Sequence, residues 1–384
     1  MNKKLLFYQI ACLALIIFVT PASSEFLGEN IPGRFFKLMM VPAVAVFLPE
    51  FMRYSTKIEK SYVVMMLIAC VFHMFVKLEN KETNPFWESF TWISIVYVLA
   101  LNRRYNNCKL VLLAMIAFYF MECSVAIYEK LSMSSFIDWS DTKSFFGRAD
   151  SYEYSSEFRS TAFLLHALNN ANVVSIILAF ILCTDKISNK ARLPLLGLGF
   201  MALWAFNSRG AMVMWMIIII YWIFFRNKNI VIVSLSGLAA YLLVPIVIDF
   251  ISNNEVFGRL NEGFDDSSSQ TRLYAFIFFA MHPWNFNNIL FGGDIIYMPG
   301  SILSLENGVL LNLGYWGWII GSLKTIFEVM ISYKVLPNSF DVKTRIVIMA
   351  ALWGVAFMNN NSFQPLVFSY FLFANVSYNT INTK

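Results

Sequence analysis

The sequence predicts an all-α, polytopic integral membrane protein with about twelve transmembrane helices and a large loop on the outer face. Hydrophobic residues make up 58% of the chain and charged residues only 14%, whereas a soluble chain carries about 25% charged residues. The apolar runs are continuous, which excludes the alternating segments of about ten residues that build a transmembrane β-barrel. The net charge of +5 is explained by basic cytoplasmic loops, so no nucleic-acid partner is expected.

Twelve apolar segments are expected to span the membrane. They are Met1–Ala22, Phe35–Pro49, Ser61–Val76, Trp87–Leu101, Lys109–Tyr128, Thr161–Cys183, Leu193–Asn207, Gly210–Phe225, Asn229–Ile251, Asn307–Tyr333, Thr344–Met358 and Ser362–Tyr378. The first of them also resembles a cleavable signal peptide. Two, Phe35–Pro49 and Leu193–Asn207, fall short of the ~20 residues of a straight span, so their ends should extend outward.

The basic residues set the orientation, because cytoplasmic loops are enriched in Lys and Arg. Every second connection is basic, beginning with Lys3 and Lys4, and the connections between them are acidic or mixed. Both termini are therefore expected in the cytoplasm of a bacterial cell, with residues 1–384 forming one domain in its inner membrane. The polar segments 129–160 and 252–306 then form two periplasmic loops.

Arg209 lies in Asn207-Ser208-Arg209-Gly210, which interrupts an apolar stretch and predicts a very tight outer hairpin. An arginine at a membrane-embedded turn needs an anionic partner or access to water. One guanidinium group can donate two parallel hydrogen bonds to a phosphate, so Arg209 is a candidate phosphate ligand. The alternative is an arginine that reaches up to the lipid headgroups.

Arg159 precedes a spanning segment whose outer half is unusually polar, with Asn169 among several asparagines and His166. These side chains need partners in the bundle or in a water-filled cavity. A cavity would let them bind sugar hydroxyls. The alternative is that they join neighbouring helices.

The long loop supplies further candidates. Arg272 is placed in the first turn of an apolar run, Leu273–Met281, where the helix dipole disfavours a cation, so an anionic partner is expected. His282 follows that run and could act as a general base or be structural. No segment has the ligand spacing of a metal site, so no metal is expected.

The end of the loop pairs an acid with an asparagine, Glu306-Asn307, before the sequence GVLLNLGYWGWIIG. This pattern predicts a short helix that re-enters the bundle, with Gly314, Gly317 and Gly321 allowing close packing. Glu306 could be a base or a sugar-binding carboxylate. It could equally be an acid that the helix dipole favours.

These features together resemble the O-antigen polymerase (Wzy) family, within the O-antigen polymerase and ligase superfamily. The resemblance covers about Arg159–Gly321. It rests on Arg159 before the polar span, on Ser208-Arg209-Gly210, on the loop from Arg272 to Phe291-Gly292-Gly293-Asp294, and on Glu306-Asn307. In the ligase branch a histidine commonly precedes the asparagine, and Glu306 in that position favours a polymerase.

The resemblance implies polymerisation of undecaprenyl-pyrophosphate-linked oligosaccharide units into lipopolysaccharide chains, without a cofactor. Arg159, Arg209 and Arg272 would bind the pyrophosphate, Asn169 and Asn307 the substrate, and Glu306 or His282 would accept the proton of the acceptor hydroxyl. Membrane lipids and a chain-length regulator protein are the further partners expected. The alternatives are an O-antigen ligase, which joins glycan to the lipid A core, and a flippase or transporter, in which internal repeats and midplane charges are expected.

Overall fold

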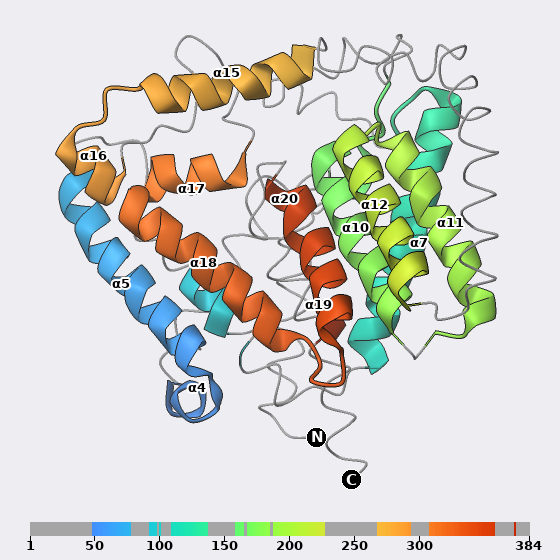
Figure 1. The fold of residues 1–384 in the computed structure, drawn as a ribbon, viewed down its shortest axis with the longest axis horizontal. Coiled ribbons are helices and arrows are strands. Elements are labelled where there is room, and N and C mark those ends of the chain that lie inside the picture. Colours follow the sequence, from blue (N-terminus) through green and yellow to red (C-terminus); the bar gives the residue numbers. More distant parts are fainter. Residues whose placement is uncertain are drawn as a thin grey trace. The chain divides into compact units, whose positions relative to one another are not determined.

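The computed structural model describes residues 48–77, 92–97, 100, 109–136, 158–164, 167–184, 187–226, 267–292, 307–357 and 372–373. All regular elements in these ranges are helical (Figure 1), which confirms the all-α prediction for this part of the chain. Among the same residues, no helix combines the length and the hydropathy of a membrane span.

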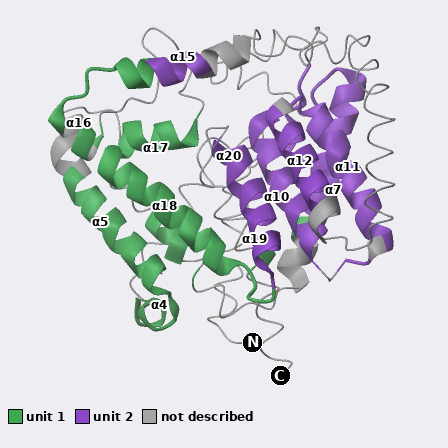
Figure 2. Ribbon diagram, viewed as in Figure 1, with its two compact units in different colours: residues 1–116, 278–339, 359–384 green, residues 117–277, 340–358 purple. Residues whose placement is uncertain are grey.

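The chain divides into two compact units (Figure 2). Unit 1 comprises residues 1–116, 278–339 and 359–384, and unit 2 comprises residues 117–277 and 340–358. Two helices cross the boundary in sequence: α7 (Lys109–Ser132) and α15 (Ser267–Met281).

Unit 1 is built around the pairing of two long helices, α5 and α18. Its described helices are α4 (Leu48–Tyr54), α5 (Lys57–Lys77), α16 (Phe286–Phe291), α17 (Gly308–Trp316) and α18 (Trp318–Val335). A capping box starts α5: the backbone N–H of Thr56 donates to Glu59, and the N–H of Glu59 donates to the Thr56 hydroxyl. α5, α16 and α17 all pack against α18.

Glycines bring the backbones of α16, α17 and α18 into direct contact. Gly292 and Gly317 have φ values of 80° and 86°, a region that L side chains rarely adopt. A Cβ on Gly317 would lie 2.5 Å from the Leu290 carbonyl oxygen, and one on Gly321 would lie 2.3 Å from that of Asn312. The predicted close packing at Gly317 and Gly321 is therefore confirmed.

A buried ion pair joins these helices from within. Lys324 Nζ lies 2.6 Å from Glu328 Oε1, and both side chains are 0% exposed. The Tyr62 hydroxyl of α5 donates to Glu328 over 2.9 Å, and Lys324 donates to Asn312 of α17 over 3.2 Å. Lys324 Nζ also lies 3.7 Å from the centroid of the Trp92 ring. A buried pair of charges is tolerated when further hydrogen bonds accompany it, and here those bonds hold α5, α17 and α18 together.

Unit 2 surrounds one central helix, α10 (Ala167–Cys183), of which nearly every residue is buried. Around it pack α11 (Asn189–Ala205), α12 (Arg209–Arg226), α19 (Val342–Met349), a π-helical turn η5 (Ala350–Gly354) and the short α20 (Val355–Phe357). On α7, the Tyr119 hydroxyl donates to the Leu195 carbonyl of α11 over 2.5 Å. A short 3₁₀ turn, η3 (Ala162–Leu164), precedes α10.

Several predicted segments coincide with these helices. α5, α7, α11 and α12 cover Ser61–Val76, Lys109–Tyr128, most of Leu193–Asn207 and Gly210–Phe225. α11 begins at Asn189, so its first end extends outward as expected. The tight hairpin at Asn207 is confirmed, with α12 starting at Arg209. The predicted segments Met1–Ala22 and Asn229–Ile251, most of Phe35–Pro49 and almost all of Ser362–Tyr378 lie outside the described residues.

Two local predictions were wrong. The segment Asn307–Tyr333 is not one helix, because the positive φ of Gly317 separates α17 from α18; the short helix expected after Glu306-Asn307 is α17. Arg272 is not in a first turn, since α15 begins at Ser267. The polar run Ser267–Gln270 forms the first turn of this helix. The helix dipole therefore gives no reason to expect an anion beside Arg272.

The close approach at Gly321 makes a specific prediction about stability. Gly321→Ala should lower the free energy of unfolding by about 1–3 kcal/mol, because the new methyl group has no room against the Asn312 backbone. Gly197→Ala is the matched control: Gly197 is also helical, but nothing lies within 4 Å of its added Cβ. That substitution should raise the free energy of unfolding by about 0.5–1 kcal/mol. Thermal unfolding of the two purified variants tests the packing, and equal effects would contradict it.

Candidate functional site

The strongest candidate site is the turn that leads into α10, residues 158–164 of unit 2. The carboxylate of Glu129, near the end of α7, organises this turn. It accepts hydrogen bonds from the backbone N–H groups of Thr161 and Ala162 over 2.9 and 3.0 Å, and from the Ser160 hydroxyl over 2.5 Å. A fourth bond comes from the Phe136 N–H over 2.8 Å. Hydrogen bonds to an ionised acceptor are stronger than neutral ones, so this buried carboxylate fixes the turn to α7.

Two further contacts hold the turn at its start. The ammonium group of Lys130 donates to the Phe158 carbonyl over 2.6 Å and lies 5.8 Å from the Trp204 ring centroid. Burial lowers the pKa of Lys130. The backbone N–H of Ser160 donates to the Ala205 carbonyl at the end of α11 over 3.1 Å. The residues on either side of Arg159 are thus attached to two different helices.

The backbone of the turn is strained at one position. Ala162 has a φ of 35°, which costs about 1–3 kcal/mol for a residue other than glycine. The bonds that Glu129 accepts offset this cost. Strained backbone that its surroundings impose is often found at functional sites.

Arg159 is the one charged side chain that this turn carries. It is half-buried, between the buried Phe158 and Ser160. Its Nε atom is buried and finds no hydrogen-bond acceptor among the described residues. A buried donor left without an acceptor costs about 1–3 kcal/mol, and a guanidinium group stays charged at all physiological pH values. The turn therefore places a half-buried cation whose Nε donor an anionic acceptor would satisfy.

Other polar atoms without partners lie along the same turn. Asn170, in the first turn of α10, donates to the Thr161 carbonyl over 2.6 Å, but its own Oδ1 accepts no bond from the described residues. On α7, the Glu122 carboxylate accepts one long bond from the Phe163 N–H, of 3.4 Å, through Oε2; Oε1 accepts none in the described part of the chain. The hydroxyl of Thr161 is likewise buried without a partner there. Hydroxyl groups of a ligand could supply both donors and acceptors to such a set.

The other sequence-predicted residues of unit 2 are placed only in part. Asn169 lies half-buried in the first turn of α10, beside Asn170. Arg209 is the first residue of α12, and Arg272 lies in the second turn of α15. The side chains of both arginines are outside the described part of the structure, so their role as phosphate ligands stays a prediction.

The remaining residues that the sequence predicted for the site, Asn307, Glu306 and His282, belong to unit 1. Asn307 is the N-cap of α17: its Oδ1 accepts from the N–H groups of Val309 and Leu310 over 3.0 and 3.1 Å. That oxygen therefore caps the N-terminus of α17. Glu306 lies outside the described residues, and its predicted role as a base stays a prediction.

His282 directly follows α15 and packs in a cluster of aromatic rings. Its ring centroid lies 5.6 Å from that of Phe278 and 4.9 Å from that of Trp284, both edge-on. Trp284 in turn contacts Phe279 and Trp318 at 4.7 and 5.6 Å, and its indole N–H donates to the Phe279 carbonyl. These contacts agree with the structural alternative for His282.

Sequence reasoning missed the residues that build the turn, Glu129 and Lys130. Both were assigned to the start of a loop, whereas α7 continues to Ser132 and buries them. One signal was available: Glu122 and Glu129 are seven residues apart, which places them on one face of a helix. Among the described residues, no group of three or more His, Cys, Asp or Glu side chains is arranged to hold a metal ion.

Comparison with known proteins gives no match: no family model, no curated protein and no solved structure is significantly similar to this chain.

The role of Glu129 leads to a direct prediction. Glu129→Gln removes the negative charge that four donors share, and one of the amide's two polar ends can only donate. Hydrogen–deuterium exchange at the backbone amides of Thr161 and Ala162 should then accelerate roughly tenfold or more, the equivalent of about 1.4 kcal/mol. Glu122→Gln is the control, because among the described residues that carboxylate accepts one hydrogen bond, of 3.4 Å. Unchanged exchange in Glu129→Gln would show that the turn does not depend on this carboxylate.

Proposed function

We propose that this protein polymerises lipid-linked oligosaccharide units, with Arg159 binding the pyrophosphate of the lipid carrier. The observation that carries the proposal is the half-buried side chain of Arg159, whose buried Nε lacks an acceptor among the described residues. Asn170 and Glu122, with their unpartnered oxygens nearby in the fold, add groups that suit sugar hydroxyls. The sequence resemblance to the O-antigen polymerase family supports the same reaction.

In this proposal the helices lie in the bacterial inner membrane, with the Arg159 turn on the periplasmic side. The strongly apolar composition and the distribution of basic residues support this placement. The exposed apolar side chains on several helices, such as Val64, Ile217 and Ile319, agree with contact to lipid.

The reaction needs little covalent chemistry from the protein. The acceptor hydroxyl of one lipid-linked unit attacks the anomeric carbon of the growing glycan, the bond from that carbon to the pyrophosphate oxygen breaks, and undecaprenyl pyrophosphate leaves. A base takes the hydroxyl proton; Glu306 is the proposed base, with His282 as the alternative. Negative charge grows on the leaving pyrophosphate, and a preorganised cation such as Arg159 stabilises it. Arg209 and Arg272 are proposed as further ligands of the phosphates.

Deletion of the gene separates the candidate functions. Loss of a polymerase leaves a single repeat unit on the lipid A core. Loss of a ligase leaves none there, while lipid-linked polymer accumulates. Loss of a flippase traps the units on the cytoplasmic side. We expect a single repeat unit on the lipid A core. Either of the other two results would assign the protein as a ligase or as a flippase.

Arg159 can be tested in the same deletion strain. Complementation with Arg159→Ala should lower polymerisation roughly a hundredfold or more, which is the usual effect of removing one group that stabilises developing charge. Lipopolysaccharide ladders on gels would then show single repeats in place of long chains. Arg159→Lys should restore only part of the activity, because lysine keeps the charge but not the bidentate geometry.

The control is Arg192→Ala, also in unit 2. The Nη2 atom of Arg192 donates to the carbonyl groups of Thr184 and Ile187 over 2.6 and 3.1 Å, and these two bonds tie this guanidinium to the backbone of unit 2. At equal protein levels in the membrane fraction, Arg192→Ala should give normal chains. Normal chains from Arg159→Ala as well would exclude Arg159 from the site.

A further inference from the structure

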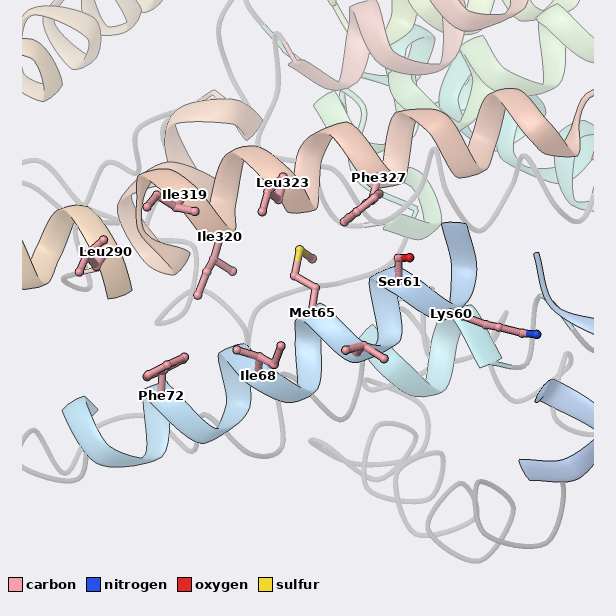
Figure 3. Close-up of a pocket in the computed structure, with 11 residues that line it drawn as sticks. Lys60, Ser61, Met65, Ile68, Phe72, Leu290, Ile319, Ile320, Leu323 and Phe327 are labelled. Carbon is pink, nitrogen blue, oxygen red and sulfur yellow. The ribbon is translucent and has the colours of Figure 1, made fainter. Parts of the chain in front are cut away.

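A groove in unit 1 points to a ligand that the proposed reaction does not use. It lies between α5 and α18 and has a volume of about 610 Å³, a size typical of sites for small molecules. Figure 3 shows Met65, Ile68 and Phe72 of α5 facing Ile320, Leu323 and Phe327 of α18 across it. Ile68 and Leu323 are 49% and 41% exposed, so the groove is open along its length.

The polarity of the groove is one-sided. Its lining is apolar except for Lys60 and Ser61, which lie together at one end. At the opposite end lies Leu290 of α16, and the Lys60 side chain extends away from the apolar walls (Figure 3). Lys60 forms no ion pair with any residue that the structure describes. The groove thus combines apolar walls with a single positive charge at one end.

We propose that this groove binds one acyl chain of an anionic phospholipid, with the phosphate of its headgroup at Lys60. The match is one of charge and shape, because an anionic lipid has a single negative end and a long apolar chain. A protein helix in the groove would need polar partners around a rim, and the lining provides only the pair at one end. Basic sites between helices on the cytoplasmic side are known to bind anionic lipid headgroups.

The proposed orientation in the membrane decides between two lipids that carry phosphate: a phospholipid of the cytoplasmic leaflet and the lipid-linked glycan of the periplasmic side. The basic residues Arg53, Lys57 and Lys60 place this end of α5 on the cytoplasmic side. The pyrophosphate of the lipid-linked glycan belongs to the opposite side, at the proposed reaction site. The ligand at Lys60 is therefore a phospholipid of the cytoplasmic leaflet, and the inference rests on the proposed membrane placement alone, not on the polymerase reaction.

Native mass spectrometry of the full-length protein in detergent tests the inference, with phosphatidylglycerol and phosphatidylethanolamine as probes. The protein should retain phosphatidylglycerol in preference to the zwitterionic lipid. Leu323→Trp, which fills the groove, should abolish the preference. Lys60→Gln should weaken phosphatidylglycerol binding roughly fivefold, since one basic residue contributes about that factor at a membrane surface.

Each variant has a matched control. Ile326→Trp adds the same ring to an exposed position of α18 that does not line the groove, and Lys57→Gln removes an exposed charge of α5 outside it. Both should bind phosphatidylglycerol like the parent protein, and thermal unfolding should show all four variants folded. Equal retention of the two lipids, unchanged binding in Leu323→Trp and Lys60→Gln, a bound polyisoprenyl phosphate, or a lipid-free dimer would each overturn the inference. Because bound lipid is weighed and no turnover is measured, these outcomes do not depend on the polymerase assignment.

Discussion

The Glu129 carboxylate is the constraint on which the candidate site depends. It is 0% exposed and yet accepts four hydrogen bonds, three of them from the consecutive residues Ser160, Thr161 and Ala162. A buried carboxylate is acceptable in a protein interior when donors surround it. In return it holds Ala162 at a positive φ and sets the direction in which Arg159 leaves the backbone. A cation that is fixed before its ligand arrives needs no reorganisation when charge develops beside it.

Both units bury polar groups, and each does so with different partners. In unit 1, Lys324 and Glu328 pair with each other and with Tyr62 and Asn312, so that this network holds three helices together. In unit 2, Arg159 and Glu122 each carry a buried polar atom that finds no partner in the described ranges. Glu328 also leaves its Oε2 without a partner in the described ranges, so one such atom does not by itself identify a site. Around the Arg159 turn, several such atoms belong to residues that are attached to one turn, and a polar ligand could satisfy them together.

Within the described ranges, several helices were predictable, because long apolar runs ended by charged or small residues leave few alternatives. The short helix after Asn307 and the tight hairpin at Asn207 followed from local sequence. Arg159 and Asn169 were found as candidates because polar residues next to an apolar helix are unusual. The error at Arg272 arose because Ser267–Gln270 has no apolar residue, and helix formation there follows from context and not from pattern.

The residues that build the site were not predictable in the same way. Glu129 and the turn that it holds are about thirty residues apart in sequence, and no periodicity links a carboxylate on one helix to backbone N–H groups before another. The apolar groove was equally hidden, since neither Lys60 of α5 nor Leu323 of α18 is unusual in the sequence around it. Both features depend on tertiary packing, which brings distant segments together.

The proposed binding of a lipid-linked pyrophosphate at Arg159 can be measured directly. Purified protein is titrated with undecaprenyl pyrophosphate, and binding is followed by isothermal calorimetry. Arg159→Ala should weaken binding roughly tenfold or more, as expected for the loss of a charge-assisted contact of about 1.5–3 kcal/mol, whereas Arg192→Ala should leave it unchanged. Equal affinities in the parent protein and in Arg159→Ala would show that Arg159 does not bind the pyrophosphate.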